Sequence, residues 1–280
     1  MLTPEIVLIG GPNSGKTHYS GQLYGRLQRN PGVLSLRRAE GAPVDLSAFQ
    51  EVFRCLESGN AASHTPTDTW AEVCLPLEDE TGRALDLRWP DYGGEQLKQI
   101  LSTRSVNMDW QARLCIAKGW LLLIRLSAEV TYPDALEKLA EHPHCGEQSA
   151  DRVNCWDANA YWVEKLQILL HVAKLGIVTP LQSPRLAVLL SCYDELGEAS
   201  DVPSEELARK LPLVASFIRN NWHEDKVSVW GLSALGQTLT SSSGVEAFID
   251  DGPEYQGWVI SPAGGERNTD LSLPLKWLLD

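Results

Sequence analysis

One stretch of eight residues constrains the fold of this chain more than any other feature of its sequence. Residues 10–17 read GGPNSGKT, which fits the pattern GxxxxGK[ST]. The apolar segment before it, EIVLIG at 5–10, predicts a buried strand, and Leu23 and Leu27 after it share one face of a predicted helix. A glycine-rich loop between a strand and a helix is typical of proteins with parallel sheets, so the sequence predicts an α/β fold.

The residue types in this loop suit it to bind phosphate groups. Its glycines leave room for backbone N–H groups to turn toward an anion, and the amino end of the following helix adds partial positive charge. We expect Lys16 to reach the β and γ phosphates of a nucleotide, and the Thr17 hydroxyl to bind Mg²⁺. The alternative is a glycine-rich turn with an exposed lysine. The residues expected to contact the nucleotide here are Gly10, Asn13, Ser14, Gly15, Lys16, Thr17 and His18.

The remaining apolar segments complete the predicted sheet. Short segments rich in leucine or β-branched residues alternate with longer segments of helical period, which is typical of a parallel sheet with helices on both faces. The predicted strands are 5–10, 70–77, 84–89, 119–126, 185–191 and 227–233. The predicted helices are 17–29, 46–58, 158–175, 204–220, which Pro212 interrupts, and 273–279. The second and third strands flank a polar turn and form an antiparallel hairpin. The fold class expected is a three-layer α/β sandwich, in which a mostly parallel six-stranded sheet has one antiparallel strand.

Composition limits the partners that the chain can bind. Its 24 Lys and Arg residues against 37 Asp and Glu give a net charge of −13, which repels nucleic acid and anionic lipid. The densest apolar run, residues 120–124, is far shorter than the roughly 20 residues that span a bilayer. The six cysteines form no CxxC pair, and the first residues lack the basic and apolar parts of a secretory signal. We therefore expect a cytoplasmic protein with no nucleic-acid partner and no membrane insertion.

A second motif lies just after the predicted hairpin. Residues 91–95 read DYGGE, and a turn of this kind is ordinary when it stands alone. Its place downstream of the phosphate loop favours a role in nucleotide binding. Asp91, at the end of a strand, can hold Mg²⁺ through water, and the N–H of Gly94 can approach the γ-phosphate. The two motifs together predict a site that senses the third phosphate.

The order of these motifs resembles that of the Ras-like GTPases related to translation factors. SCYD at 191–194 follows a predicted strand where such GTPases carry NKxD, and SAL at 233–235 follows the next strand where they carry SAK. More narrowly, the loop GGPNSGKT, GGE at 93–95 and PLKWLL at 274–279 resemble the bacterial "double-GTPase" domains of GTPase-associated conflict systems. The resemblance implies the P-loop NTPase fold.

The resemblance also places guanine against the loops after these strands. A carboxylate accepts two hydrogen bonds, and guanine offers two adjacent donors, N1–H and its exocyclic amine, so Asp194 is expected to select guanine. The N–H of Ala234 is expected to donate to guanine O6. Ser191 and Cys192 stand where the family pattern has Asn and Lys, which reduces both the bracing of the loop and the cover over the base. An acid at 194 that only caps a turn is the alternative. The residues expected to contact the base are Cys192, Asp194, Ser233, Ala234 and Leu235.

Hydrolysis is expected to involve Lys16, Gly94 and Glu95. By resemblance, Glu95 occupies the position of a glutamine that orients the attacking water. Its carboxylate can accept a proton from water but cannot donate to the γ-phosphate and repels it, so we expect slow intrinsic turnover. Alternatively, Glu95 only favours the amino end of the helix that starts there. The expected Mg²⁺ ligands are Thr17, Asp91 and either Thr65 or Thr67.

Three functional hypotheses follow. The leading one is a guanine-nucleotide switch that binds GTP with Mg²⁺, hydrolyses it to GDP, slowly without a partner, and signals through loops that the nucleotide orders. The alternatives are a nucleotide-binding scaffold protein with weak catalysis and an ATP-specific P-loop NTPase. The resemblance implies a single enlarged G domain over 1–280, with insertions around 30–64 and 128–156. It also implies a protein partner or effector, for which another GTPase subunit is one option.

Overall fold

An eight-stranded sheet runs through the described part of the chain, in the order β2-β3-β4-β1-β5-β6-β7-β8. The computed structural model describes residues 3–37, 45–62, 72–90, 103, 106, 108–132, 157–176, 178–197, 202–240, 242 and 244–280. Five neighbouring strands are parallel to one another: β4 (Ala84–Pro90), β1 (Glu5–Gly10), β5 (Gly119–Ile124), β6 (Arg185–Ser191) and β7 (Val227–Ser233). The strands whose pairings are all antiparallel are β2 (Leu34–Leu36), β3 (Glu72–Asp79) and β8 (Trp258–Ile260).

The mostly parallel α/β sheet expected from the sequence is confirmed, but the predicted count of six strands is wrong. All six predicted strands are found, and β3 and β4 form the expected antiparallel hairpin. The two additional strands, β2 and β8, have three residues each. So short a segment shows no alternation of polar and apolar residues, which is why the sequence does not mark it.

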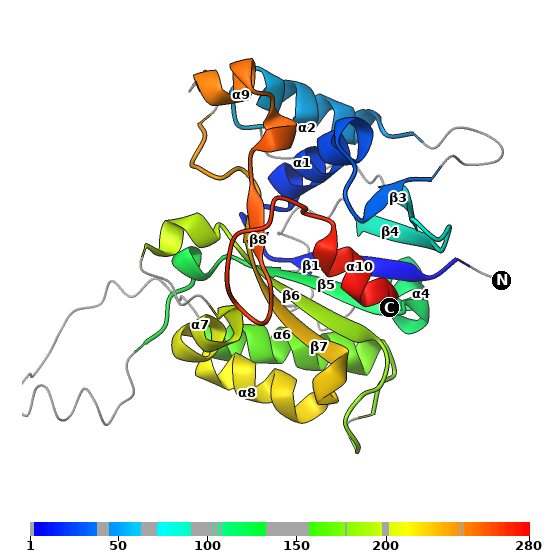
Figure 1. Ribbon diagram of the computed structural model, residues 1–280. Helices are drawn as coiled ribbons and strands as arrows, with labels where there is room; N and C mark the ends of the chain where they lie inside the picture. Colours follow the sequence, from blue (N-terminus) through cyan, green and yellow to red (C-terminus); the bar gives the residue numbers. More distant parts are fainter. Residues whose placement is uncertain are drawn as a thin grey trace, which may run out of the picture.

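Helices cover both faces of the sheet (Figure 1). On one face lie α1 (Lys16–Arg29), α2 (Ser47–Glu57) and α10 (Leu273–Leu279), and α9 (Glu246–Asp250) packs against α2. On the other face lie α4 (Met108–Ile116), α6 (Ala158–Val172), α7 (Pro203–Lys210) and α8 (Pro212–Asn221). The short 3₁₀ helices are η1 (Leu126–Ala128), η2 (Tyr193–Leu196), η3 (Glu224–Lys226) and η4 (Pro253–Tyr255). In the ranges given above, no helix has both the length and the apolar character needed to cross a membrane.

The helix predicted over 204–220 with an interruption at Pro212 is confirmed as two helices, α7 and α8. Pro212 is the first residue of α8. Proline has no backbone N–H and cannot continue a helix, but it suits the first position of a new one. The other four predicted helices are confirmed, with ends that differ by a few residues.

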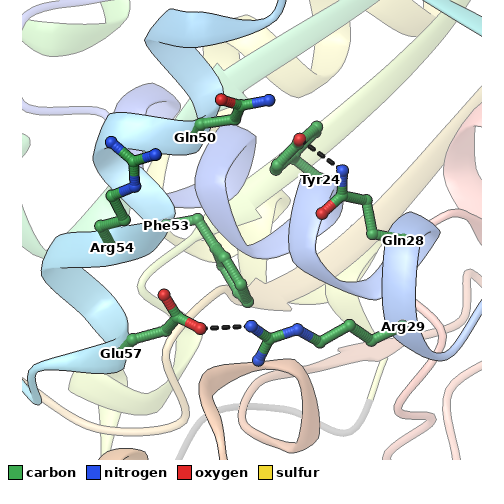
Figure 2. A pocket seen from close by; sticks show the side chains of 7 residues that line it. All are labelled: Tyr24, Gln28, Arg29, Gln50, Phe53, Arg54 and Glu57. Carbon is green, nitrogen blue, oxygen red and sulfur yellow. Dashed lines mark hydrogen bonds and ion pairs between the residues drawn. The ribbon is translucent and has the colours of Figure 1, made fainter.

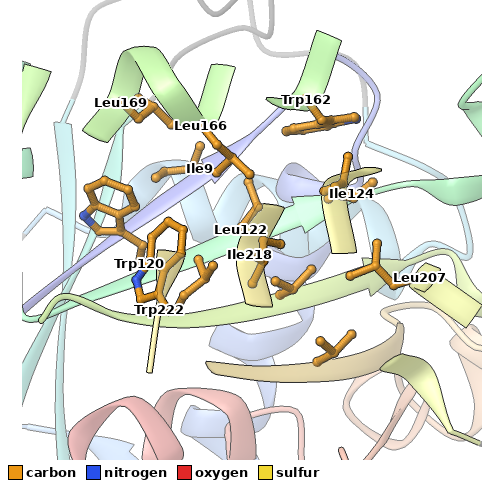
Figure 3. Close-up of a cluster of buried hydrophobic side chains, with 14 of the residues drawn as sticks. Ile9, Trp120, Leu122, Ile124, Trp162, Leu166, Leu169, Leu207, Ile218 and Trp222 are labelled. Atoms are coloured by element: carbon orange, nitrogen blue, oxygen red, sulfur yellow. The ribbon is translucent and has the colours of Figure 1, made fainter. Parts of the chain in front are cut away.

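Alternate residues of the central strands belong to two separate hydrophobic clusters. In β1, Ile6 packs with α1, α2 and α10, whereas its neighbour Val7 packs with α4, α6 and α8. Figure 3 shows the second cluster, where the rings of Trp120 and Trp222 pack edge to face with centroids 6.2 Å apart. Because both faces of these strands are covered, their sequences are continuous apolar runs.

Two glycines allow α2 to pack closely against α1. A Cβ on Gly21 would lie 2.4 Å from Cγ1 of Val52, and a Cβ on Gly25 would lie 2.0 Å from Cε2 of Phe53. Carbon atoms that are not bonded do not approach so closely, so the packing of the two helices requires both glycines.

Buried polar contacts fix another side of α1. The Gln22 amide is fully buried and donates to the carbonyls of Pro253 and Gln256 at 2.7 and 2.9 Å. The Arg26 guanidinium donates to the carbonyls of Gln256 and Gly257 at 2.7 and 3.2 Å. These bonds satisfy buried backbone oxygens and hold α1 against the segment that leads into β8.

We expect Gly25→Ala to destabilise the protein, although alanine favours a helix over glycine by about 1 kcal/mol. The added methyl group would collide with the Phe53 ring, and overpacking of a core costs roughly 1–3 kcal/mol. Urea denaturation followed by circular dichroism measures the change in the free energy of unfolding. Gly176→Ala is the matched control, because a Cβ there meets nothing within 4 Å. Recovery in the double variant Gly25→Ala, Phe53→Leu would assign the loss to this contact, and no loss in Gly25→Ala would contradict the argument.

Candidate functional site

Four loops lie at one edge of the sheet because the strands before them are parallel. The strands β1, β5, β6 and β7 are neighbours and run in the same direction, so their carboxyl ends meet at that edge. The loops that follow them contain residues 10–17, 125–128, 191–196 and 233–235. The predicted phosphate-binding residues and the predicted base-binding residues therefore lie on the same side of the molecule.

The side chain of Lys16 closes the phosphate loop, residues 10–17, on itself. Its Nζ donates to the carbonyls of Gly10 and Gly11 at 3.0 and 2.6 Å, and lies 3.3 Å from Oγ of Ser14. The buried Ser14 hydroxyl donates to the Gly11 carbonyl at 2.8 Å. A Cβ on Gly10 would lie only 2.6 Å from that hydroxyl, so this arrangement requires glycine at the end of β1. The ammonium group is thereby fixed at the amino end of α1.

The backbone of the phosphate loop is arranged to receive an anion. Asn13 and Gly15 have φ angles of 55° and 77°, in the left-handed region that favours glycine and tolerates asparagine. Gly15 is the N-cap of α1, and this end of the helix has neither a side-chain cap nor an acidic residue in its first turn. The first N–H groups of a helix have no intrahelical acceptor, which suits them to phosphate oxygens. Thr17 and His18 are half-buried on this first turn.

The phosphate loop is in contact with the loop that follows β6. A Cβ on Gly15 would lie 3.8 Å from Cβ of Ser191 and 3.9 Å from Sγ of Cys192. Ser191 is 3% exposed, and its Oγ has no hydrogen-bond partner within the described residues. The NKxD pattern has asparagine at this position. A serine side chain is shorter and has only one hydroxyl, so it cannot make the hydrogen bonds of an asparagine amide to the neighbouring loop.

Cys192 places a neutral thiol beside the phosphate loop. Its φ of 51° puts it in the left-handed region, and it precedes η2. Burial raises the pKa of the Cys192 thiol to about 11, and the nearby Glu195 carboxylate adds to the increase. The thiol therefore stays protonated near neutral pH and supplies none of the positive charge that a lysine would bring to this position.

Asp194 lies on η2 between two residues that are firmly held. The ring of Tyr193 is buried against Gly231, where a Cβ would lie 3.1 Å from it. The Glu195 carboxylate accepts two hydrogen bonds from the Arg125 guanidinium, at 2.9 and 2.6 Å. Asp194 itself is half-buried and makes no hydrogen bond with any residue that the structure describes. Sequence reasoning missed Arg125 and Glu195, because no local pattern links two residues 70 positions apart.

The loop after β7 is held from two sides. Ser233 is buried, and its Oγ accepts a hydrogen bond from the N–H of Gly236 at 2.9 Å. The Ala234 carbonyl lies so close to Gly257 that a Cβ there would be 2.3 Å from it. Leu235 packs against the small hydrophobic cluster between α2 and α9. All three predicted residues of this loop are therefore fixed in place next to the loop that carries Asp194.

Five predicted site residues lie outside the described part of the chain: Thr65, Thr67, Asp91, Gly94 and Glu95. The strand β4 ends at Pro90, one residue before Asp91, and runs parallel beside β1. Of the predicted Mg²⁺ ligands, Thr17 is the one that the structure places. A hydroxyl at the amino end of α1 fits the preference of Mg²⁺ for oxygen ligands that it shares with phosphate.

Sequence reasoning also missed a buried lysine behind the phosphate loop. Lys165 of α6 is 1% exposed, and its Nζ lies 3.4 Å from the ring centroid of Tyr161. A Cβ on Gly11 would lie 3.9 Å from that Nζ. Nearby, the Trp162 indole donates to the Glu129 carboxylate at 2.8 Å. The signal in the sequence is a lysine on the apolar face of a predicted helix, where lysine is seldom buried without a specific partner.

A shallow pocket of about 200 Å³ lies between α1 and α2, away from these loops (Figure 2). Its lining residues are Tyr24, Gln28, Arg29, Gln50, Phe53, Arg54 and Glu57. In Figure 2, Arg29 points toward Glu57, with which it forms an ion pair, beside the ring of Phe53. The pocket uses the carboxyl half of α1, whereas the phosphate loop adjoins its amino end, so the two are separate.

Several solved structures are similar to this chain at a low level. One is from the signal recognition particle receptor SRb-GTP/SRX complex of Chaetomium thermophilum, with 16% identity, a TM-score of 0.39, and coverage of 86% of this chain and 94% of that chain. The small GTPase Arl6 of Trypanosoma brucei has 12% identity and a TM-score of 0.40. The match covers 91% of this chain and 99% of that chain. The GTPase-like domain of S. cerevisiae Ski7 has 15% identity and a TM-score of 0.43. The match covers 83% of this chain and 43% of that chain. We draw no functional conclusion from similarities of this size.

The family of the chain follows from its sequence as a whole. No curated protein matches it in a sequence search. The model of the family Double-GTPase 1 matches residues 7–278, which extend from β1 to α10 and include the phosphate loop and both loops after β6 and β7. The resemblance to double-GTPase domains expected from the sequence motifs is thereby confirmed. The chain belongs to the Double-GTPase 1 family and is a GTP-binding domain.

Proposed function

We propose that this chain is a guanine-nucleotide switch that binds GTP with Mg²⁺ and hydrolyses it to GDP, slowly in the absence of a partner. The observation that best supports the proposal is the phosphate loop, in which the carbonyls of Gly10 and Gly11 hold Lys16 at the uncapped amino end of α1. The contact of Gly15 with the loop after β6 adds a place for the base next to the phosphates. Loops ordered by the nucleotide would then signal to a protein partner.

In this proposal the phosphate loop binds the triphosphate through its backbone and through Lys16. The ammonium group contacts the β and γ phosphates, while N–H groups of the loop and of the first turn of α1 donate to phosphate oxygens. Left-handed conformations at Asn13 and Gly15 turn those N–H groups inward. The nucleotide contacts proposed for the loop are Gly10, Asn13, Ser14, Gly15, Lys16, Thr17 and His18.

The two loops after β6 and β7 bind the base. Asp194 has no hydrogen bond within the described residues, and its two oxygens can accept from N1–H and the amine of guanine. The N–H of Ala234 donates to guanine O6, while Ser233 and Leu235 shape the loop. Cys192 covers the nucleotide with a neutral thiol in place of the longer stem of a lysine.

Hydrolysis uses residues from the phosphate loop and from DYGGE. Mg²⁺, when bound, neutralises charge on the β and γ phosphates. Gly94 donates its N–H to the γ-phosphate, and Glu95 orients the attacking water as an acceptor. Because the Glu95 carboxylate cannot donate to the γ-phosphate and repels it, turnover is slow until a partner contributes. The proposed Mg²⁺ ligands are Thr17, Asp91 and either Thr65 or Thr67.

The proposal treats residues 1–280 as one G domain enlarged by insertions around 30–64 and 128–156. The first insertion supplies β2, which pairs with β3, and α2, which packs against α1, and this supports a single unit. The partner is a protein effector in the cytoplasm, and another GTPase subunit is one candidate. A net charge of −13 disfavours nucleic acid as a partner.

The base contact can be tested by exchanging one acceptor of Asp194 for a donor. Xanthine has an oxygen where guanine has its amine, so we expect Asp194→Asn to prefer XTP over GTP by roughly tenfold, the effect of one hydrogen bond. Competition of GTP, XTP and ATP against a fluorescent nucleotide measures this. Lys16→Ala is the control and should lose most affinity for every nucleotide. Unchanged GTP preference in Asp194→Asn would remove Asp194 from the base site, and stronger binding of ATP by the wild type would favour the ATP-specific alternative.

Alkylation of Cys192 can report whether GTP is bound at the proposed nucleotide site. Because thiolate is the reactive form, alkylation by iodoacetamide should be slow at pH 7 and accelerate as the pH rises toward about 11. GTP with Mg²⁺ should slow the reaction further, since the nucleotide would cover a thiol that lies beside Gly15. Mass spectrometry of peptides gives the rate for each cysteine, and the exposed Cys115 is the internal control. If GTP left the labelling of Cys192 unchanged, the proposed position of the nucleotide would be wrong.

A single-turnover assay separates the switch from the scaffold alternative. We expect phosphate release from GTP to be slow but measurable for the wild type, and slower for Glu95→Ala, which no longer orients the water. Lys16→Ala gives the background rate. If the wild type released phosphate no faster than Lys16→Ala, both alone and with a partner, the scaffold hypothesis would be favoured. Equal rates for the wild type and Glu95→Ala would leave Glu95 with only a structural role at the start of a helix.

A further inference from the structure

We propose that Arg125, acting through Glu195, is a positioning residue that holds Asp194 in the orientation needed to recognise guanine. This inference rests on the proposed function, because it concerns the loop after β6, residues 191–196, which is proposed to bind the base. We call this segment the base loop. Arg125 directly follows β5, and Glu195 lies within η2, one residue after Asp194. The pair therefore joins two loops that follow neighbouring parallel strands.

The contact between the two side chains is bidentate. Nε of Arg125 donates to Oε2 of Glu195 at 2.9 Å, and Nη2 donates to Oε1 at 2.6 Å. The Ser127 hydroxyl of η1 donates to Oε2 at 2.5 Å. A guanidinium with two parallel bonds fixes the orientation of a carboxylate as well as its distance. The side chains of Arg125 and Glu195 are 33% and 21% exposed, so solvent screens this pair less than a fully exposed one.

This contact completes the support of the segment that carries Asp194. On the amino-terminal side, the Tyr193 ring packs against Gly231 of β7 and edge to face against Trp258 of β8, with centroids 6.5 Å apart. On the carboxyl-terminal side, Glu195 is held by Arg125 from β5. Asp194 lies between these two supports and has no hydrogen bond of its own within the described residues. The backbone at 194 is thus supported on both sides, by Tyr193 and by Glu195.

Arg125 adds no net positive charge beside the loop after β6, because its guanidinium is paired with the Glu195 carboxylate. The position occupied by lysine in the NKxD pattern is Cys192 here, whose thiol is neutral. The hydrogen bonds to Glu195 raise the pKa of Arg125 despite its partial burial, and the nearby Asp194 carboxylate acts in the same direction. The role of Arg125 is therefore to fix the orientation of Glu195 and not to replace the charge of the missing lysine.

The preference for GTP over ITP measures the orientation of Asp194 directly. Inosine lacks the exocyclic amine of guanine, so ITP loses one of the two hydrogen bonds to the carboxylate and keeps every phosphate contact. We expect the wild type to prefer GTP about tenfold or more, Asp194→Ala to lose the preference, and Arg125→Gln and Glu195→Gln to reduce it at least fivefold. Arg125→Lys, which keeps the charge and one hydrogen bond, should recover part of it. Competition of GTP and ITP against a fluorescent GDP gives both affinities for each variant.

The control is Arg37→Gln. Arg37 forms an ion pair with Asp86 at 2.6 Å near the opposite edge of the sheet, with side chains 30% and 15% exposed. This variant removes a pair of similar burial and should leave the GTP to ITP ratio unchanged. A folded Arg125→Gln and a folded Glu195→Gln, verified by thermal melting, that both keep the wild-type ratio would overturn the positioning role while the base contact stands. A wild type that binds GTP and ITP equally would overturn this inference and the base contact of Asp194 together.

Discussion

The amino end of α1 must lie at the carboxyl edge of the sheet, and every other part of the site depends on this constraint. Gly10, the last residue of β1, lies so close to the Ser14 hydroxyl that no side chain fits there. Gly15, in a left-handed conformation, directs the chain into α1. Lys16 then reaches back to the carbonyls at the end of β1. The helix cannot rotate or slide without breaking these contacts, because Gly21 and Gly25 bring α2 within contact distance on another side.

The same helix connects the phosphate loop to the loop after β7, residues 233–235. Gln22 and Arg26 are buried polar residues, and both donate to carbonyls of the segment that ends at Gly257. Gly257 in turn packs against the Ala234 carbonyl so closely that no side chain fits there. A buried donor that lost its acceptor would cost about 1–3 kcal/mol, so these contacts resist local displacement. The distance between the phosphate loop and the loop after β7 is therefore set by one continuous set of packed groups.

The sequence predicts the parts of this protein that depend on local pattern. Gly10 to Thr17 are recognisable because glycine and lysine at fixed spacing have few other uses, and the buried strands are recognisable as apolar runs. The edge strands β2 and β8 are not, because three residues carry no periodicity. Arg125 and Glu195 become neighbours only when β5 and β6 align in register, so no spacing in the sequence marks them. The left-handed turn at Cys192 likewise follows from its contacts and not from residue type, since cysteine has no preference for it.

The overall charge of the chain opposes its proposed ligand, and cations at the site offset this at short range. A net charge of −13 repels any nucleoside triphosphate, but salt screens such repulsion beyond about 8 Å at physiological ionic strength. The cationic side chains beside the phosphate loop are Lys16, which donates to the carbonyls of Gly10 and Gly11, and Lys165, which lies behind Gly11. Long-range repulsion slows the association of GTP and ATP alike, because both carry the same phosphates. In the proposed function, discrimination between them therefore arises in the dissociation rate, through the proposed contacts of Asp194 with the base.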